Sequence, residues 1–302
     1  MPALGTHAIQ SGECLEKLKP EIERRGLEVT QAFAEFVGAA AVSHDTLGLI
    51  LGTAYARCFE EAHVKNTDAF FLGMIKFIKE NNLQGNANAM AFLYGHIMHY
   101  ALDIRTHPLI YYMTELHPAK FTPALGAHTL FESWLDIQKE KEAGAKAEAQ
   151  GKSYKPNLPF RKSAGKGGID ALIDTVYENV YGLKKAATGY RVGINIWHAY
   201  QLVLRGAMMK HVKQYFSDFA GMLNPNGEEF LHPVTGEPQT ATFRQLYDSS
   251  IGLACELIAA VNANIFDGAD NEAALKEAFG NSFDTGIAWD DPRARQYFKQ
   301  YA

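Results

Sequence analysis

The sequence is poor in cysteine, and this excludes two kinds of structure. Its three cysteines, Cys14, Cys58 and Cys255, are spread over 302 residues. Their odd number and wide spacing give neither a disulfide framework nor the closely spaced thiolates of a structural zinc site. The absence of a disulfide pattern suits the reducing environment of the cytoplasm.

Long apolar runs are also missing. A secretory signal needs a basic start followed by an apolar run of roughly 7–15 residues, whereas residues 1–18 are interspersed with acidic, basic and histidine side chains. The most apolar region, Ala32–Ala56, is interrupted by Glu35 and by Ser43-His44-Asp45, and a membrane span needs roughly 18 uninterrupted apolar residues. We therefore expect no signal peptide, no transmembrane segment and a cytoplasmic location.

Basic residues are not in excess. The chain has 29 Lys and Arg residues against 34 Asp and Glu residues, a formal net charge of -5. A dedicated nucleic-acid-binding surface would normally be basic, so we expect no stable nucleic-acid partner. The charge does not exclude a phosphodiester substrate, because a metal ion can supply positive charge locally.

The residues that are present indicate a globular protein with an unusual histidine distribution. With 47% hydrophobic and 21% charged residues, the composition excludes disordered, collagen-like and mucin-like chains. The length permits one large core or two smaller domains. Eight of the 11 histidines precede residue 129, namely His7, His44, His63, His96, His99, His107, His117 and His128.

Helical periodicity extends over most of the sequence, whereas strand-like alternation is scarce. Apolar residues within Leu83–Tyr112 recur at the three-and-four spacing of an amphipathic helix. Pro108 predicts a helix end over Asp103–Pro108, because the residue before a proline avoids helical geometry. Further helices are predicted over Ser11–Arg24, Thr46–Ala62, Thr67–Asn81, Thr129–Glu142, Ile169–Tyr181, Ile194–Leu223, Phe243–Asn264 and Glu272–Ala278.

Two irregular stretches separate groups of these helices. Gly144–Gly168, rich in Lys, Ala, Gly and Pro, predicts an exposed loop or a lid, and the proline-containing Asn224–Gln239 predicts turns. Neither stretch establishes a domain boundary. We therefore predict an all-α fold with a single multi-helix domain over residues 1–302, its helical C-terminal part covering 169–302.

Two sets of histidines and carboxylates have the spacing of ligands on one helix face. The first is His96-x-x-His99-x-x-x-Asp103-x-x-x-His107, in which His99 and Asp103 project together and His107 follows just beyond the predicted helix end. The second is His128-x-x-x-Glu132. Imidazole and carboxylate are the ligands of hydrolytic zinc, with water completing the coordination. One such pair is common by chance, but two pairs in one helical protein predict a metal site.

The other histidines have less specific interpretations. Asp45 could cap a helix beginning near Thr46, or His44-Asp45 could be the centre of an HD-type phosphohydrolase. That enzyme would need a distal aspartate and further histidines, and it would leave His128 and Glu132 without a role. Three C-terminal histidines have no carboxylate at comparable spacing and are expected to be structural: His198, His211 and His232.

The order of these residues resembles the zinc-dependent phospholipase C family, whose fold is related to that of zinc-dependent single-strand nucleases. The resemblance covers about residues 1–136, the metal-binding half, and rests on His7, His44-Asp45, His63, Tyr94-Gly95-His96-Ile97-Met98-His99-Tyr100-Ala101-Leu102-Asp103, His107-Pro108 and His128-x-x-x-Glu132. The C-terminal half is similar to an uncharacterised bacterial branch of the family rather than to its secreted toxins, in His232-Pro233-x-Thr235-Gly236 and Ser282-Phe283-Asp284-Thr285-Gly286.

The resemblance implies a helical protein that hydrolyses phosphoester bonds with about two to three zinc ions. The implied ligands are Asp45, His63, His99 and Asp103 for the first ion, His107, His128 and Glu132 for the second, and His7 with a bridging Asp103 for the third. Asp45 also matches the position of the base that acts on the attacking water. The implied substrate is a small phosphoester or a phospholipid headgroup, and no organic cofactor is needed.

Three features depart from the secreted members. Those enzymes expose an amino-terminal tryptophan whose amine binds the third ion, whereas this sequence begins Met1-Pro2-Ala3-Leu4. The interval from Asp103 to His107 is shorter than theirs, and no β-sandwich lipid-binding domain is evident. These departures favour phosphoester hydrolysis in general over a phospholipid in particular. They also leave open a helical metal-binding or interaction protein without turnover.

Overall fold

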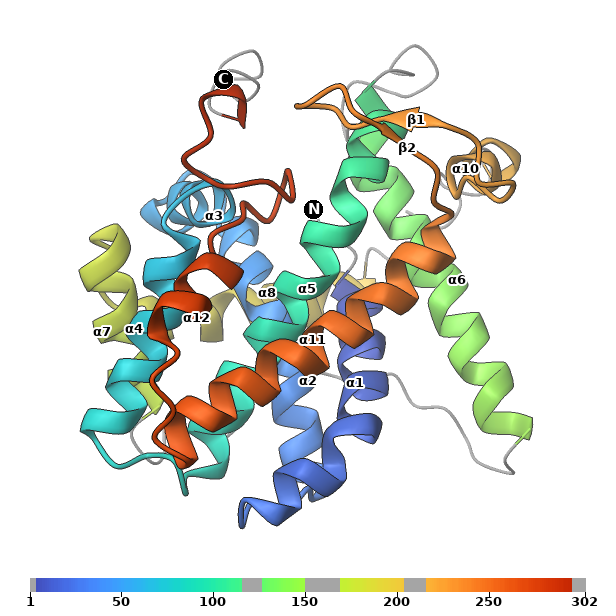
Figure 1. Cartoon of the computed structure of the whole chain (residues 1–302). Helices are drawn as coiled ribbons and strands as arrows, with labels where there is room; N and C mark the ends of the chain where they lie inside the picture. The colour runs from blue at the N-terminus through green and yellow to red at the C-terminus, as the bar shows by residue number, and fades with distance from the viewer. Residues whose placement is uncertain (1–3, 116–126, 150–168, 204–215, 295–302) are drawn as a thin grey trace.

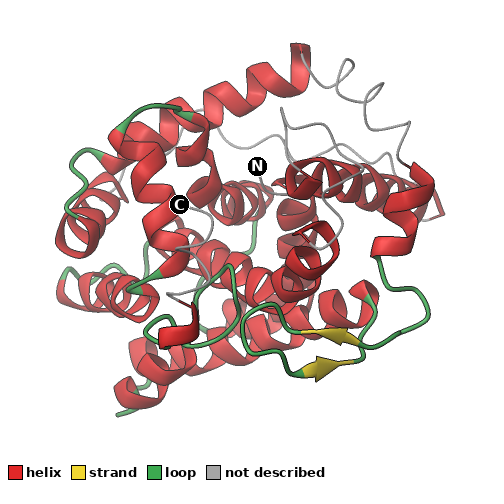
Figure 2. Ribbon diagram, turned by 90° about the horizontal axis from the view of Figure 1, so that it is seen from above, coloured by secondary structure: helices red, strands yellow, loops and turns green. Residues whose placement is uncertain are grey.

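A computed structural model describes residues 4–115, 127–149, 169–203 and 216–294 (Figure 1). Its elements are α1 (Leu4–Arg24), α2 (Gln31–Thr46), the 3-10 turn η1 (Leu47–Leu49), α3 (Ala54–Val64), α4 (Thr67–Glu80), α5 (Ala87–Glu115), α6 (Ala127–Ala149), α7 (Ile169–Tyr181), α8 (Ala186–Val203), α10 (Phe216–Met222), β1 (Phe230–Leu231), β2 (Pro238–Gln239), α11 (Phe243–Phe266) and α12 (Glu272–Ala278). Within these ranges the only sheet is the antiparallel pair β1–β2, visible at one edge in Figure 2. The all-α prediction is confirmed.

Helix α5 is the centre around which the other helices pack. It is 29 residues long, and α1, α2, α6 and α11 all contact it. Ala89, Leu93 and Ile97 are fully buried, and so are the residues beside them on other faces of the helix, such as Met90 and Met98. A helix that is apolar all round is expected to be surrounded by protein, which explains why α5 is a core helix.

A close contact between two core helices places two parts of the site together. A Cβ added at Gly95 on α5 would lie 2.5 Å from both the Ala40 Cβ and the Val37 carbonyl oxygen on α2. Only glycine therefore allows this approach of the two backbones. Because of it, the ring of His99, one turn further along α5, reaches the backbone of α2 and donates from Nδ1 to the Ala41 carbonyl at 2.8 Å.

The predicted end of this helix near Pro108 is wrong. Helix α5 continues through Pro108 to Glu115, so His107 lies within it. Proline cannot donate to the carbonyl of Ile104, and Gly286 from the C-terminal part of the chain covers that carbonyl instead. A Cβ added at Gly286 would lie 2.4 Å from the Ile104 oxygen. Tertiary packing thus tolerates a residue that would locally end the helix.

The region around Asp45 also differs from prediction. Thr46 ends helix α2 rather than beginning a helix, so Asp45 lies in the last turn of α2 and does not cap the next helix. Helix α3 begins later, where the Thr53 side chain accepts from the Tyr55 amide at 3.2 Å. The chain turns between the two helices at Gly52, whose φ of +73° suits glycine. The sequence predicts no helix over Gln31–Thr46, and the structure forms the largely buried helix α2 there.

Other boundaries shift for similar reasons. Helix α1 begins at Leu4 instead of Ser11, and α6 continues to Ala149, so the start of the predicted loop Gly144–Gly168 is helical. The rest of that loop, from residue 150, lies outside the described residues. The predicted helix Ile194–Leu223 is replaced by α8, which starts at Ala186, and by α10, with residues 204–215 between them not described.

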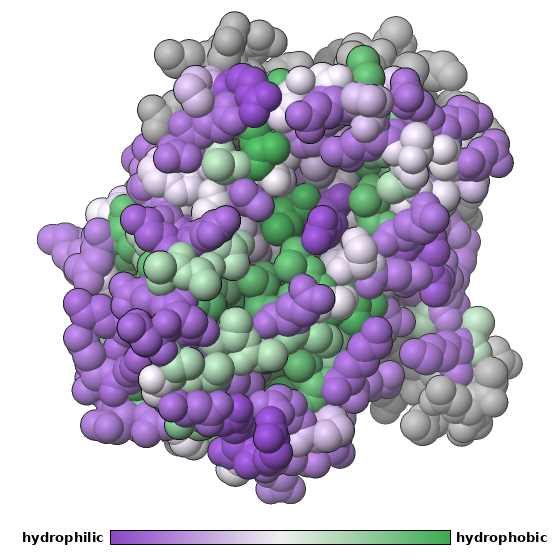
Figure 3. Space-filling model, in the orientation of Figure 1, coloured by the Kyte–Doolittle hydropathy of each residue, from purple (hydrophilic) through white to green (hydrophobic). Residues whose placement is uncertain are grey.

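Helix α11 is the only described helix that is long and apolar enough to cross a membrane, and 44% of its most apolar window is buried. A core helix passes the same test. Its buried face, including Ile251, Ile258 and Val261, packs against α5. Figure 3 shows apolar residues at the surface along α11 and above it, surrounded by hydrophilic ones. One buried hydrophobic cluster joins residues from Cys14 to Phe283. The single-domain organisation stays a prediction.

Candidate metal centre

Five helices bring together the eight side chains named as candidate ligands in the sequence. His7 comes from α1, Asp45 from α2, His63 from α3, His99, Asp103 and His107 from α5, and His128 and Glu132 from α6. Their side chains are at most 5% exposed, except that of His128, which is 25% exposed. Each ligand candidate therefore points into one buried polar cluster. Such a cluster is costly unless its charges are compensated.

Asp103 is the centre of this cluster. Its Oδ1 lies 3.1 Å from His7 Nε2 and 3.6 Å from His107 Nε2, and its Oδ2 lies 3.0 Å from His99 Nε2. His99 and His107 are each four residues from Asp103, so one face of α5 supplies all three. One carboxylate thus joins histidines from α1 and from two successive turns of α5.

Asp45 joins a further histidine to this arrangement. Its Oδ1 lies 3.0 Å from His63 Nε2 and 3.5 Å from His99 Nε2. The side chain of Asp45 is fully buried. His99 is therefore placed between the two carboxylates, Asp45 and Asp103.

His128 and Glu132, the i, i+4 pair on α6, form the other side of the cluster. His128 Nε2 lies 2.9 Å from Glu132 Oε1, and the same oxygen lies 3.5 Å from His107 Nε2. His107 is in place for this contact because α5 continues past Pro108. The shorter interval between Asp103 and His107 thus still brings His107 to the α6 pair.

Three sets of these residues have ligand atoms within 4.8 Å of one another, and each could hold a metal ion. They are His7, Asp45 and His99; His63, His99 and Asp103; and His107, His128 and Glu132.

A second observation also indicates that these residues could bind a metal ion. Within the described part of the chain, six buried polar atoms of the eight candidate ligands have no hydrogen-bond partner. Four of them are Asp45 Oδ2, Glu132 Oε2 and the ion-paired atoms His99 Nε2 and Asp103 Oδ2. Buried polar atoms are normally satisfied, and a cation bound by carboxylate and imidazole would satisfy all four.

The pKa shifts of the cluster indicate that its buried carboxylates favour positive charge beside them. Burial lowers the pKa of His99, but Asp45 and Asp103 outweigh it and raise that pKa to about 9. The pKa of His107 is lowered by burial and raised more strongly, to about 10, chiefly by Asp103 and by Glu132. Burial raises the pKa of Asp103 and that of Glu132, yet the neighbouring histidines hold both below their usual values. A bound cation would replace the protons that the histidines otherwise carry.

Three histidine rings are oriented by backbone carbonyls on their far side. His63 Nδ1 donates to Phe59 O at 2.9 Å, and His107 Nδ1 donates to Phe283 O at 2.9 Å, as His99 does to α2. Each bond leaves Nε2 facing the cluster. Metal-binding histidines usually have such an outer partner, which fixes the ring and its tautomer.

His44 and His96 lie beside the cluster in a separate network. His96 Nδ1 donates to Phe92 O, and burial lowers the pKa of His96 to about 3, so its neutral Nε2 accepts from the Tyr190 hydroxyl at 3.2 Å. Tyr190 then accepts from Tyr177, and Tyr177 accepts from His44 Nδ1 at 2.8 Å. Among the described residues, neither His44 nor His96 belongs to a set that could hold a metal.

Helix α6 also fixes the start of α1. The Asp136 carboxylate accepts from the Gly5 amide at 3.0 Å, from the Thr6 amide at 2.7 Å and from the Thr6 hydroxyl at 2.9 Å. Free amides at a helix N-terminus favour a carboxylate partner. Asp136 lies one turn after Glu132, so α6 supplies one ligand candidate and positions the helix that carries another, His7. The sequence search missed this residue, although it continues the i, i+4 series of His128 and Glu132.

The remaining histidines are not part of the cluster as described. His232 Nε2 donates to Thr285 O at 2.9 Å, and burial lowers the pKa of His232, which agrees with a structural role. His117 and His211 lie outside the described residues, and the side chain of His198 is not described.

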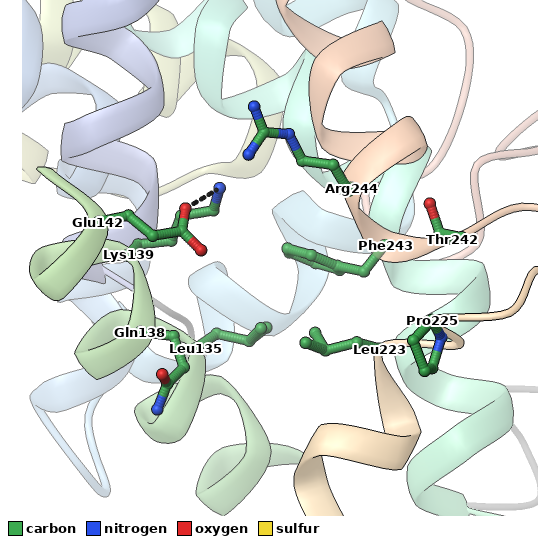
Figure 4. Close-up of a pocket in the computed structure, with 9 residues that line it drawn as sticks. All are labelled: Leu135, Gln138, Lys139, Glu142, Leu223, Pro225, Thr242, Phe243 and Arg244. Atoms are coloured by element: carbon green, nitrogen blue, oxygen red, sulfur yellow. Dashed lines mark hydrogen bonds and ion pairs between the residues drawn. The ribbon is translucent and has the colours of Figure 1, made fainter. Parts of the chain in front are cut away.

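A cavity of about 270 Å³ lies between α6, α10 and α11 (Figure 4). It is lined by Leu135, Gln138, Lys139, Glu142, Leu223, Pro225, Thr242, Phe243 and Arg244. Lys139 bonds to Glu142 at 3.1 Å and lies 3.6 Å from the centre of the Tyr247 ring, and Arg244 bonds to Asp248 at 2.9 Å. Both cations already have acidic partners, so the cavity adds nothing to the charge of the cluster.

A family model described as zinc dependent phospholipase C matches residues 6–181. That range is more than half of the chain and contains all eight candidate ligands. Comparison with curated proteins and with solved structures gives no significant match. With its helical fold and its buried histidine–carboxylate cluster, the chain belongs to the zinc-dependent phospholipase C family.

Proposed function

We propose that the protein hydrolyses phosphoester bonds by means of water activated by zinc. The observation that carries this proposal is the buried cluster, in which four atoms suited to bind a cation have no hydrogen-bond partner among the described residues. Family membership supports zinc and hydrolysis. Zinc bound there would supply a water acidic enough to act as a nucleophile near neutral pH, together with positive charge for the phosphoryl oxygens.

The proposed ligand sets follow the contacts of the cluster. The first ion would be held by Asp45, His63, His99 and Asp103; the second by His107, His128 and Glu132; and the third by His7 and Asp103. Asp103 would be shared, since one of its oxygens is nearest His99 and the other is nearest His7. About two to three ions are therefore expected, each bound by nitrogen and oxygen.

Asp45 is the proposed base. One of its carboxylate oxygens faces His63 and His99, while Oδ2 is buried without a hydrogen-bond partner in the described structure. A carboxylate with one engaged and one available oxygen can be oriented by the first and accept a proton with the second. This geometry supports for Asp45 the role that the family resemblance implies.

The proposed substrate is a small phosphoester or a phospholipid headgroup. Family membership favours a lipid-type substrate. The formal net charge of -5 gives no support for a stable nucleic-acid partner. The cytoplasmic location stays a prediction.

An HD-type phosphohydrolase centred on His44-Asp45 is less well supported. His44 is in none of the sets that could hold a metal among the described residues. By contrast, His128 and Glu132 contact His107 within the cluster. Replacing His128 and Glu132 with Gln separates the two hypotheses, because only the phospholipase C arrangement should then lose a metal ion.

The test combines metal analysis with a substrate panel. We expect elemental analysis of the purified protein to find about two to three zinc ions per chain, and anomalous scattering at the zinc edge to place them in the cluster. We also expect hydrolysis of aryl phosphodiesters or phosphomonoesters that is abolished by a chelator and restored by zinc. Zinc without turnover on a broad phosphoester panel would favour a non-catalytic metal-binding protein and contradict the proposal.

A further inference from the structure

A segment near the C-terminus, residues 280–289, closes over the metal-binding cluster. We call it the C-terminal clasp. It follows α12, and a single bridge between Asn281 and Ala288 joins its two sides. The segment lies about a hundred residues beyond the end of the family match at residue 181. Its contacts with the cluster are therefore a property of this chain rather than of the matched region.

One end of the clasp is fixed to the helix that carries His63. The backbone carbonyl of His63 accepts from the Ser282 hydroxyl at 3.0 Å and from the Phe283 amide at 2.9 Å. The Phe283 ring is buried against the imidazoles, with ring centres 5.2 Å from His63 and 5.5 Å from His99. The clasp therefore places an aromatic ring against two histidines of the first proposed ion site.

Two neighbouring residues of the clasp, Phe283 and Asp284, reach the second proposed ion site. His107 Nδ1 donates to the Phe283 carbonyl at 2.9 Å, and Asp284 Oδ1 lies 3.7 Å from the same nitrogen. The Asp284 side chain is 16% exposed. Among the candidate ligands on α5, His107 is thus the one whose described outer hydrogen-bond partner comes from the clasp.

The clasp is held in this position from two further directions. Gly286, with φ of +67°, rests on the Ile104 carbonyl that Pro108 leaves without a helical donor. On its outer side, His232 donates to the Thr285 carbonyl. The position of Asp284 is therefore set by the packing on both sides of it.

We propose that Asp284 is a positioning residue for the second ion site, acting through His107. This inference rests on the proposed zinc centre. The carbonyl of Phe283 sets which nitrogen of His107 carries the proton, and the Asp284 carboxylate beside that nitrogen makes the ring a stronger donor to a cation at Nε2. Outer partners that accept the ring N–H typically change metal affinity by roughly 10–100-fold. Asp284, whose Oδ1 lies 3.7 Å from His107 Nδ1, acts through its charge, so we expect an effect at the lower end of that range. Asp284 itself binds no ion in this proposal.

The experiment measures zinc affinity site by site in the full-length protein. Asp284→Asn removes the charge and keeps the shape and the Phe283 carbonyl. The matched control is Asp290→Asn, an exposed acid in the next turn of the chain. Zinc is titrated against a chromophoric chelator, and Co²⁺ substituted for zinc reports the coordination of each site by visible absorption.

We expect Asp284→Asn to weaken the binding of one zinc ion by roughly 10-fold, to alter one component of the Co²⁺ spectrum and to leave the binding of the other ions unchanged. Asp284→Glu should restore part of the affinity, and Asp290→Asn should match the unmodified protein. The melting temperature of each metal-free variant shows that the fold is retained. Equal zinc affinity in Asp284→Asn and the unmodified protein would overturn this inference alone, whereas an unmodified protein that binds no zinc would overturn the zinc centre as well.

Discussion

Replacing Asp103 by asparagine should remove more of the metal centre than any other single change. The carboxylate is almost fully buried and lies within 3.6 Å of three histidine nitrogens. Asparagine has nearly the same shape but carries no charge and offers one oxygen instead of two. The first and third proposed ions would each lose a ligand oxygen. The second set, His107, His128 and Glu132, would keep all its members.

The size of the effect follows from linkage. Zinc at 100 times its dissociation constant stabilises the folded state by about 2.7 kcal/mol per site, and a site weakened 100-fold keeps only about 0.4 kcal/mol. Each weakened site thus loses about 2.3 kcal/mol of zinc-dependent stability. For 302 residues this is roughly 4 °C in melting temperature. With two sites affected, the rise in Tm on adding zinc should be about 7 °C smaller in Asp103→Asn.

The assay compares the Tm of each protein with and without zinc, so that any effect of the substitution on the metal-free fold cancels. Bound zinc is counted in parallel by elemental analysis. The control is Asp174→Asn, because Asp174 lies outside the cluster and accepts from the Ala187 amide at 2.8 Å, where asparagine can still accept. If Asp103→Asn kept the full zinc content, the full rise in Tm and the hydrolysis of aryl phosphoesters, the proposed metal centre would be refuted.

Three further predictions concern how the helices that carry the site are held. Gly193→Ala should lower the free energy of unfolding by about 2 kcal/mol or more, because the added Cβ would lie 2.2 Å from the Thr46 carbonyl oxygen at the end of α2. Chemical denaturation measures this change, and an unchanged midpoint would contradict the packing. Asp136→Ala should cost about 1–3 kcal/mol and lower zinc content through His7 on α1; full zinc retention would show that His7 is placed without it. Thr242→Ala should cost about 1 kcal/mol, since it removes the capping box of α11, with no change in bound zinc; loss of zinc in this variant would mean that α11 affects the centre directly.

The ligand spacing could be predicted from the sequence, but the helix that carries it could not. His99, Asp103 and Glu132 were visible because four-residue intervals place side chains on one helix face. The continuation of α5 through Pro108 could not be predicted. The local rule for proline does not include Gly286, which lies 178 positions after Pro108 and covers the freed Ile104 carbonyl.

The outer contacts of the cluster were also beyond sequence reasoning. His107 donates to a backbone carbonyl, that of Phe283, and a carbonyl is present at every residue, so it leaves no signal in the side-chain pattern. In the sequence, the Ser282–Gly286 motif indicates a branch of the family and gives no sign of contact with His107. The buried bonds from His44 through Tyr177 and Tyr190 similarly join helices distant in sequence. Such contacts depend on the packing of whole helices rather than on local spacing.

Because α5 is continuous, it fixes the spacing of the candidate ligands that it carries. His99, Asp103 and His107 follow one another at four-residue intervals on one helix, and each interval is a rise of about 6 Å. The spacing of the first and second proposed ion sites would therefore be set by the helical rise, with Asp103 between His99 and His107. Inserting one residue between Asp103 and His107 would turn His107 by about 100° away from the others. In this chain a one-residue insertion at that point should therefore remove His107 from the proposed second ion site.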